Sequence, residues 1–247
     1  MIATIALKEL RSLFAAPSTW LILGVLQFIF AWFFLARLDA FLQVQSQLAQ
    51  LASAPGATQA IAVPLFGAAA LIMMLLVPVF TMRMIAEERR NQTMTLLATA
   101  PVSSTQIVLG KFIALLLFLL PIIASCLLMV LALGADTQLD NGLLLGNALG
   151  LLLLAASYAA LGLYVSSLTA QPAVAAIAAL AALFGLWLVE ASATDNDSAW
   201  RLLAPTSHFE SFNLGLLNSG DVVYFLLFCA TFLLLAIRRL DNNRVYG

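Results

Sequence analysis

Six long apolar stretches constrain the fold of this chain more than any other feature. A helix needs about 20 apolar residues to cross the roughly 30 Å hydrocarbon layer of a bilayer. The stretches are apolar on all sides instead of alternating, which excludes the strands of a β-barrel. They lie at about residues 18–38, 61–82, 112–133, 143–168, 172–190 and 222–237. The sequence therefore predicts an all-α integral membrane protein with six transmembrane helices.

The composition supports a membrane environment. The chain is 63% hydrophobic and 9% charged, whereas average soluble domains are roughly 45–50% apolar and about 25% charged. A soluble core of this length could not bury so much apolar surface. The net charge of −1 provides no basic field for a nucleic-acid partner, and we expect none.

The positive charges predict the orientation. With the N-terminus inside, nine Lys and Arg residues fall in the inner segments and two in the outer segments, Arg37 and Arg201. The inner residues are Lys8, Arg11, Arg83, Arg89, Arg90, Lys111, Arg238, Arg239 and Arg244. Because basic residues favour the cytoplasmic side, both termini are predicted to be cytoplasmic, as in a multi-pass protein of the bacterial inner membrane.

Residues 1–16 form a separate unit from the membrane-spanning region, residues 17–247. At 100° per residue, Thr4, Lys8, Arg11 and Ser12 fall on one arc, apolar residues fall on the other, and Glu9 lies at the border. Such a helix is suited to lie in the headgroup plane. Pro17 breaks it and can open the first span.

Several catalytic motifs are missing from the sequence. Gly110-Lys111 lacks both the earlier glycine and the following Ser or Thr of a nucleotide-binding loop. A single histidine, His208, cannot build a zinc site with cysteines in distant spans, and its simplest place is solvated or interfacial. The sequence thus predicts neither an enzyme nor a resident cofactor.

The span interiors contain no Asp, Glu, Lys, Arg or His. Arg37, Arg83, Lys111 and Glu190 are all predicted at span ends, where long side chains reach the headgroups. Ion-coupled carriers place such residues near the bilayer midplane. The energy for any transport is therefore expected to come from another protein, although an ATPase-independent secondary transporter remains an alternative.

The inner loop, residues 83–111, is the most unusual segment. Residues 87–90 are charged and extend the second span. Residues 93–98 can form a short helix that Pro101 ends, and residues 103–106 form a capping box that starts the next helix. The loop is either a charged hairpin that fixes topology or a docking element for a cytoplasmic partner.

The outer segment, residues 191–220, is predicted to form one or two short helices at the outer membrane surface. Ser207 and Glu210 suggest a second capping box, and Phe209, Phe212 and Leu216 are spaced along one face. The segment serves either as a lid or partner-binding element or as an interfacial anchor.

The fourth and fifth spans are rich in small residues. Gly146 and Gly150 form a G-x-x-x-G, and alanines continue the pattern. Small residues let helices approach closely in lipid. The pattern fits packing within the chain, and it also fits a dimer seam.

The inner loop resembles the permease subunits of ABC-2 type ABC transporters, closest to the gliding-motility (Gld) and nitrous-oxide-reductase maturation (Nos) group. The family pattern E-E-[KR]-x-x-G-T-[IL]-E-L-L-L-x-[AST]-P-V-S, then I-[VL]-L-G-K-F, appears here as EERRNQTMTLLATAPVS (residues 87–103) and IVLGKF (107–112). Further matches are KELR (8–11), PTSHFESF (205–212) and GDVVYF (220–225). The chain departs from the pattern at Gln92 and Thr95, where a glycine and an acidic residue are usual.

The resemblance implies a role for the inner loop. Two six-span subunits, identical or paralogous, would pair above two cytoplasmic ATPase subunits, which bind ATP and Mg. The loop would be a coupling helix seated on the ATPase through Thr93, Met94, Leu96 and Leu97 and ended by Pro101.

Charged residues would hold that loop in place. Glu87, Glu88 and Arg89 would lock it to the partner or to an N-terminal elbow helix. That elbow helix contains Lys8, Glu9 and Arg11. Nucleotide binding would then rock the spans.

The resemblance implies export or conformational work driven by ATP, or a mechanotransmitting subunit that moves no substrate. Membrane lipids and an outer-side accessory protein are further expected partners. No residue cluster in the sequence identifies a substrate.

Overall fold

The computed structural model describes residues 1–48, 56–92, 102–135, 140–192 and 203–246. Every regular element within these ranges is a helix. The all-α prediction is confirmed for this part of the chain.

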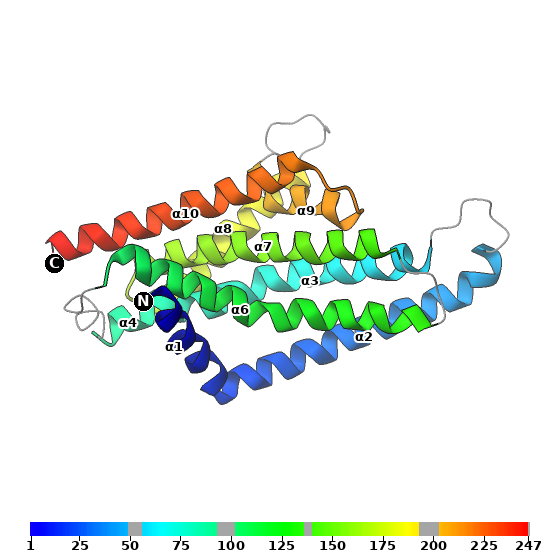
Figure 1. Cartoon of the computed structure of the whole chain (residues 1–247), viewed down its shortest axis with the longest axis horizontal. Coiled ribbons are helices and arrows are strands. Elements are labelled where there is room, and N and C mark those ends of the chain that lie inside the picture. The colour runs from blue at the N-terminus through cyan, green and yellow to red at the C-terminus, as the bar shows by residue number, and fades with distance from the viewer. Residues whose placement is uncertain (49–55, 93–101, 136–139, 193–202, 247) are drawn as a thin grey trace.

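Six of these helices are long and apolar enough to cross a membrane, which confirms the predicted number of spans. They run side by side along the long axis of the molecule (Figure 1). They are α2 (Pro17–Leu48), α3 (Ala57–Met82), α6 (Ser104–Leu131), α7 (Asn141–Leu168), α8 (Pro172–Ser192) and α10 (Ser219–Tyr246).

Two helices extend well beyond the predicted spans. α2 continues from the expected end near residue 38 to Leu48, and α10 continues from residue 237 to Tyr246. Hydropathy marks where the chain leaves the hydrocarbon layer, but a helix made of good helix formers does not have to end there. In α2, for example, the Gln43 amide donates to Asp39 at 2.9 Å, one turn apart.

The predicted start of α6 is confirmed in atomic detail. The Gln106 backbone N–H donates to the Ser103 hydroxyl at 3.3 Å, and the Ser103 backbone N–H donates to the Gln106 side chain at 3.4 Å. This reciprocal pair satisfies two backbone donors at the helix start. The helix therefore begins before its membrane-spanning part.

The second predicted capping box is wrong. α9 (Pro205–Asn213) has Ala204 at its N-cap, so Ser207 lies within the first turn, where its hydroxyl donates to the Ala204 carbonyl at 2.8 Å. Pro205 determines this start, because its fixed φ suits the first helical position. Phe209 and Phe212 are buried, as their spacing predicts, but Leu216 lies beyond the helix and is 63% exposed.

α7 is the central helix of the bundle and contacts α3, α6, α8, α9 and α10. Its glycines permit close approach: a Cβ at Gly150 would lie 2.4 Å from the Phe212 Cβ, and one at Gly162 would lie 2.3 Å from the Thr81 hydroxyl. In the fourth span the small residues thus serve packing within the chain. In α8 only Ala175, Ala179 and Leu183 are buried.

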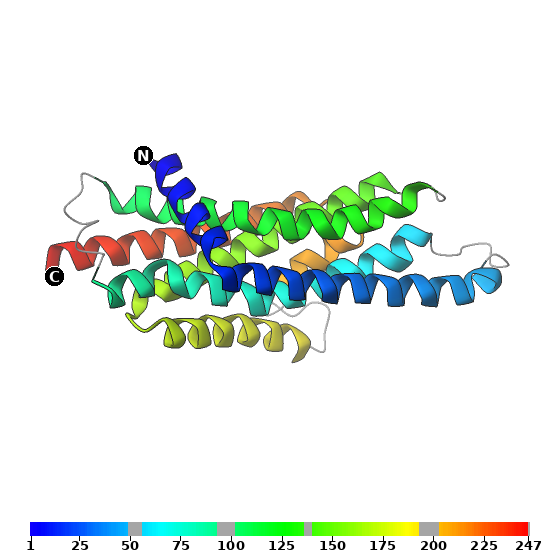
Figure 2. The same cartoon turned by 90° about the horizontal axis from the view of Figure 1, so that it is seen from below.

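The N-terminal helix α1 (Ile2–Ala15) crosses the bundle obliquely before the chain bends into α2 (Figure 2). Ala16, between the two helices, has an extended backbone. Both ends of the chain lie at the same end of the bundle as α4 (Glu88–Arg90) (Figure 1).

The close contact between α7 and α9 yields a prediction with an internal control. Gly150→Ala forces Phe212 to move, so we expect a lower unfolding midpoint in detergent, equivalent to about 1–3 kcal/mol of overpacking. Gly185→Ala introduces a Cβ with nothing within 4 Å. Since alanine favours a helix over glycine, this control should leave the midpoint unchanged or raise it. Equal midpoints for both variants would contradict the packing described.

Candidate functional site

The site begins where α1 packs on α6. A Cβ at Gly110 would lie 2.8 Å from the Ile5 Cγ2 atom and 3.2 Å from the Ile2 carbonyl oxygen, so the absence of a side chain there lets the two helices touch. On α1, Ala6, Glu9 and Leu13 are buried. The border residue of the predicted amphipathic helix, Glu9, therefore turns inward.

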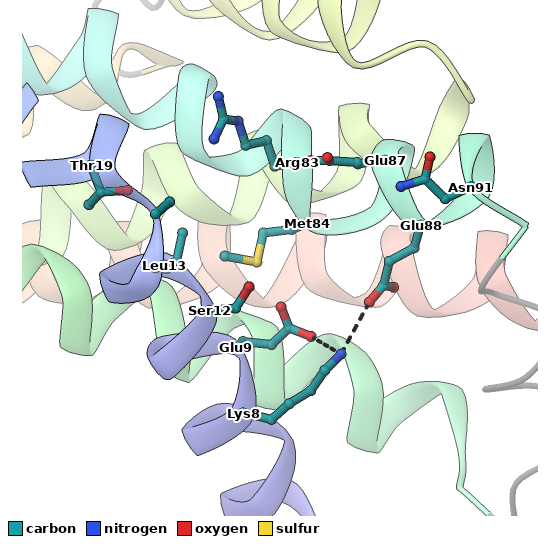
Figure 3. Close-up of a pocket in the computed structure, with 11 residues that line it drawn as sticks. Lys8, Glu9, Ser12, Leu13, Thr19, Arg83, Met84, Glu87, Glu88 and Asn91 are labelled. Atoms are coloured by element: carbon teal, nitrogen blue, oxygen red, sulfur yellow. Dashed lines mark hydrogen bonds and ion pairs between the residues drawn. The ribbon is translucent and has the colours of Figure 1, made fainter.

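Lys111, the residue after this contact, is the centre of an ion cluster. Its ammonium lies 3.2 Å from the Glu9 carboxylate of α1 and 2.7 Å from the Glu88 carboxylate of α4. Lys8 lies 3.0 Å from Glu9 and 3.7 Å from Glu88. We call Lys8, Glu9, Glu88 and Lys111 the ion cluster; Figure 3 shows its three outer members, Lys8, Glu9 and Glu88. It joins α1, α4 and α6, which come from separate parts of the sequence.

Lys111, Glu9 and Glu88 satisfy one another largely away from water, whereas the Lys8 side chain is 65% exposed. The Lys111 side chain is 1% exposed, and a buried ammonium is costly unless it is paired. Burial alone would raise the pKa of the Glu9 carboxyl, but Lys111 and Lys8 outweigh burial and hold that pKa below its usual value. Burial would likewise lower the pKa of Lys8, and the two glutamates reverse the shift and raise it.

The prediction for Lys111 is wrong. The sequence places it at a span end with a side chain that reaches the headgroups, whereas the structure buries it against α1 and α4. The available signal was its position: Lys111 lies two turns inside a helix that begins at the Ser103 capping box, directly after a glycine. A lysine at that depth faces another helix instead of solvent.

The segment that carries Glu88 has a widened turn. α3 continues through η1 (Arg83–Glu87), a five-residue π-helical turn, into α4. At this turn the hydroxyl of Ser166 from α7 accepts from the Ala86 N–H at 3.0 Å and donates to the Met82 carbonyl at 3.3 Å. Those two backbone groups would bond to each other in a regular α-helix, so Ser166 has entered the hydrogen-bond ladder.

The widened turn sets the direction of the residues that follow. A π turn inserts one residue into the helix, and each residue of an α-helix turns by about 100°. The turn therefore rotates Glu88 toward Lys111.

The other predicted site residues have different surroundings. Glu87 is exposed and lines a cavity of about 560 Å³ beside the ion cluster (Figure 3). Arg89 is close enough to Arg239 of α10 for their charges to repel, and Arg11 is exposed on α1. The remaining members of the predicted set lie outside the described residues: Thr93, Met94, Leu96, Leu97 and Pro101.

A second polar group lies at the opposite end of the bundle and holds α9. His208 Nδ1 lies 2.6 Å from the Asp221 carboxylate, and its ring stacks on Tyr224 at 3.9 Å between centroids. The Thr206 hydroxyl donates to Glu190 of α8. The solvated alternative predicted for His208 is wrong, because its side chain is only 12% exposed and is paired; its interfacial place stays a prediction. Among the described residues no group of three His, Cys, Asp or Glu could hold a metal ion.

The helices and the ion cluster define the class: a multi-pass membrane protein with a polar junction at one end of its bundle. Residues 39–238 match the protein family described as ABC-2 family transporter protein, and the chain belongs to that family. A comparison with curated proteins found no match. The chain is thus a membrane permease component of an ABC-2 type transporter. Such membrane domains have no nucleotide-binding site and no cofactor, and ATP is hydrolysed by a partner subunit.

The shifted pKa of Glu9 predicts how the α1 contact responds to acid. Because that pKa is below the unfolded value of about 4.3, the ionised carboxylate stabilises the contact above this pH, and the contribution is lost as pH falls through the lower folded value. Spin labels at the exposed positions Leu7 and Thr105 should report an unchanged distance from about pH 8 to 5 and a broader distribution below pH 4. Glu9→Gln should abolish the transition, and persistence of the transition in that variant would contradict the assignment.

The widened turn predicts a dependence of the ion cluster on Ser166. Ser166→Ala lets Ala86 bond to Met82, so the turn should become α-helical and Glu88 should leave Lys111. A double-mutant cycle with Glu88→Gln and Lys111→Met, read from unfolding midpoints, should give about 1–3 kcal/mol of coupling in the parent chain and under about 0.5 kcal/mol with S166A.

The matched control for this cycle is Ser167→Ala. Ser167 is equally buried, but its hydroxyl donates to the Tyr164 carbonyl of its own helix. The coupling should persist with S167A. Persistence with S166A as well would show that Ser166 does not set the turn.

Proposed function

We propose that the chain is one of two six-span subunits of an ATP-driven exporter or conformational machine of the Gld/Nos group. Residues 83–111 form the loop that docks on the ATPase, and α1 is the elbow helix. The same loop motif that resembles this group, EERR at residues 87–90, contains Glu88 of the ion cluster. A subunit that does mechanical work on a partner outside the membrane, and moves no substrate, would use the same coupling path.

The ion cluster is the observation that carries this proposal. The loop leaves the bundle at α4 and returns at α6, and Lys111 ties both arms to α1. A push on the loop from a cytoplasmic partner would therefore reach α1, α3 and α6 together. Packed elements that move as rigid bodies transmit displacement in this way.

The distribution of charge supports an orientation with both termini in the cytoplasm of a bacterium. α4 and both chain ends lie at one end of the bundle, and the nine inner basic residues belong to these segments and to the start of α6. The positive-inside bias assigns that end to the cytoplasm, which is where an ATPase is available.

Exposed aromatic surface supports pairing with a second subunit, a copy or a paralogue. Phe28 and Trp32 of α2 are 69% and 70% exposed and line a shallow apolar hollow with Ile29. Only 11% of the apolar 18-residue stretch of α2 is buried within the chain. Large apolar side chains can pack against another subunit, with lipid covering the rest of the surface.

The docking role is tested with the full chain and its ATPase subunit. Leu96→Asp combined with Leu97→Asp places two charges in the expected contact, so ATPase co-purification and stimulated ATP turnover should fall at least about tenfold, since a charge buried unpaired at an interface is costly. The measurement is the amount of ATPase retained and its rate of hydrolysis.

The control carries the same substitutions at the other end of the bundle. Leu216→Asp with Leu217→Asp changes two leucines that are 63% and 65% exposed, and it should leave ATPase binding unchanged. Both proteins must elute as single species with similar unfolding midpoints. Normal binding and turnover in the loop variant would refute the docking assignment.

A further inference from the structure

The cavity beside the ion cluster lies at the end of the bundle where the first predicted span begins and the second ends. It is bounded by α1, by the first turn of α2 at Ala16 and Thr19, and by η1, where α3 emerges from the bundle. Two apolar spans therefore end at its walls. Trp20, one residue from Thr19, is 60% exposed, and exposed tryptophans at helix ends are typical of the membrane interface.

Two opposite charges in this cavity are not used by the ion cluster. Arg83 and Glu87 line its wall, and within the described part of the chain neither side chain makes an ion pair or hydrogen bond. A regular helix would place them one turn apart, where they could pair. Instead, the Arg83 side chain extends away from Glu87 (Figure 3), so both remain available to a ligand.

Thr19 adds a buried polar group on another wall. The residue is 2% exposed, and its hydroxyl has no hydrogen-bond partner among the residues that the structure describes. In Figure 3 the Arg83 guanidinium extends toward the side of the cavity where Thr19 lies. The hydroxyl oxygen itself keeps some accessible surface, so a ligand oxygen in the cavity could accept a hydrogen bond from it.

We infer that this cavity binds the headgroup of a zwitterionic aminophospholipid, with the phosphate held by Arg83 and Thr19 and the ammonium held by Glu87. Guanidinium groups bind phosphate oxygens with two parallel hydrogen bonds. The paired charges of Lys8, Glu9 and Glu88 contribute no strong net attraction for an anion, which favours a neutral headgroup over an anionic one. Leu13 and Met84 provide apolar lining for the glycerol region.

Arg83 and Glu87 belong to the loop proposed to dock on an ATPase, but lipid binding is measured without the ATPase, so the two proposals can fail separately. The volume of about 560 Å³ accommodates a headgroup with room for water. The inference assigns to Arg83 and Glu87 a ligand that the family membership does not specify.

The test is native mass spectrometry of the full chain in detergent with phosphatidylethanolamine, phosphatidylglycerol or phosphatidylcholine added. We expect phosphatidylethanolamine to be retained most, because phosphatidylglycerol lacks an ammonium and phosphatidylcholine cannot donate a hydrogen bond to Glu87. Arg83→Gln should reduce its retention about tenfold, the loss expected for a charge-assisted contact. Glu87→Gln should remove the preference over phosphatidylglycerol.

Thr19 and a surface arginine complete the comparison. Thr19→Val should weaken retention about threefold while Thr19→Ser restores it, which separates a hydroxyl contact from a packing defect. Arg90→Gln removes an exposed arginine that does not line the cavity and should have no effect. A similar unfolding midpoint for each variant excludes misfolding as the cause.

Soluble competitors distinguish a lipid from a free headgroup. Inorganic phosphate and O-phosphoethanolamine at millimolar concentration should not displace phosphatidylethanolamine, because neither has the glycerol and acyl portions. Displacement by phosphate would show an anion site, and displacement by O-phosphoethanolamine a soluble zwitterion site; either overturns the lipid assignment. Equal retention of all three lipids, or full retention by Arg83→Gln, also overturns it.

Discussion

One buried ammonium group organises the end of the bundle where α1 and α4 lie. Lys111 cannot reach bulk water, so its charge must be met by carboxylates from other elements. Glu9 and Glu88 both contact it, and the contact at Gly110 brings α1 near enough for Glu9 to do so. This pairing ties α1 and α4 to α6. Removing one partner would leave the others with an uncompensated charge.

The spans and one helix start were predictable because they depend on local sequence. Apolar length identifies six crossings, and Ser103 with Gln106 encodes the start of α6 in four residues. The ion cluster was not predictable in the same way. Lys111, Glu9 and Glu88 come from three distant segments, and nothing in their spacing shows that they meet. The widened turn was hidden too, because its cause is Ser166, a residue of another helix.

The errors around α9 have a related origin. Ser207 and Glu210 have the spacing of a capping box, but Pro205 starts the helix earlier. His208 was predicted to be solvated or interfacial because a single histidine cannot build a zinc site, whereas its partners, Asp221 and Tyr224, lie on α10. In both cases a local pattern was correctly recognised, and a neighbouring residue or helix determined the outcome.

Glu87 and Glu88, which follow α3 in η1 and α4, are adjacent in the sequence, and this has a consequence for how the helix can move. Because the π turn holds one extra residue, a return to α-helical geometry would advance the following residues by one position and bring Glu87 to the place that Glu88 occupies. The helix could then shift by a single residue, a rise of about 1.5 Å, and exchange one carboxylate for an identical one. Lys111 would therefore be paired with Glu88 before such a step and with Glu87 after it.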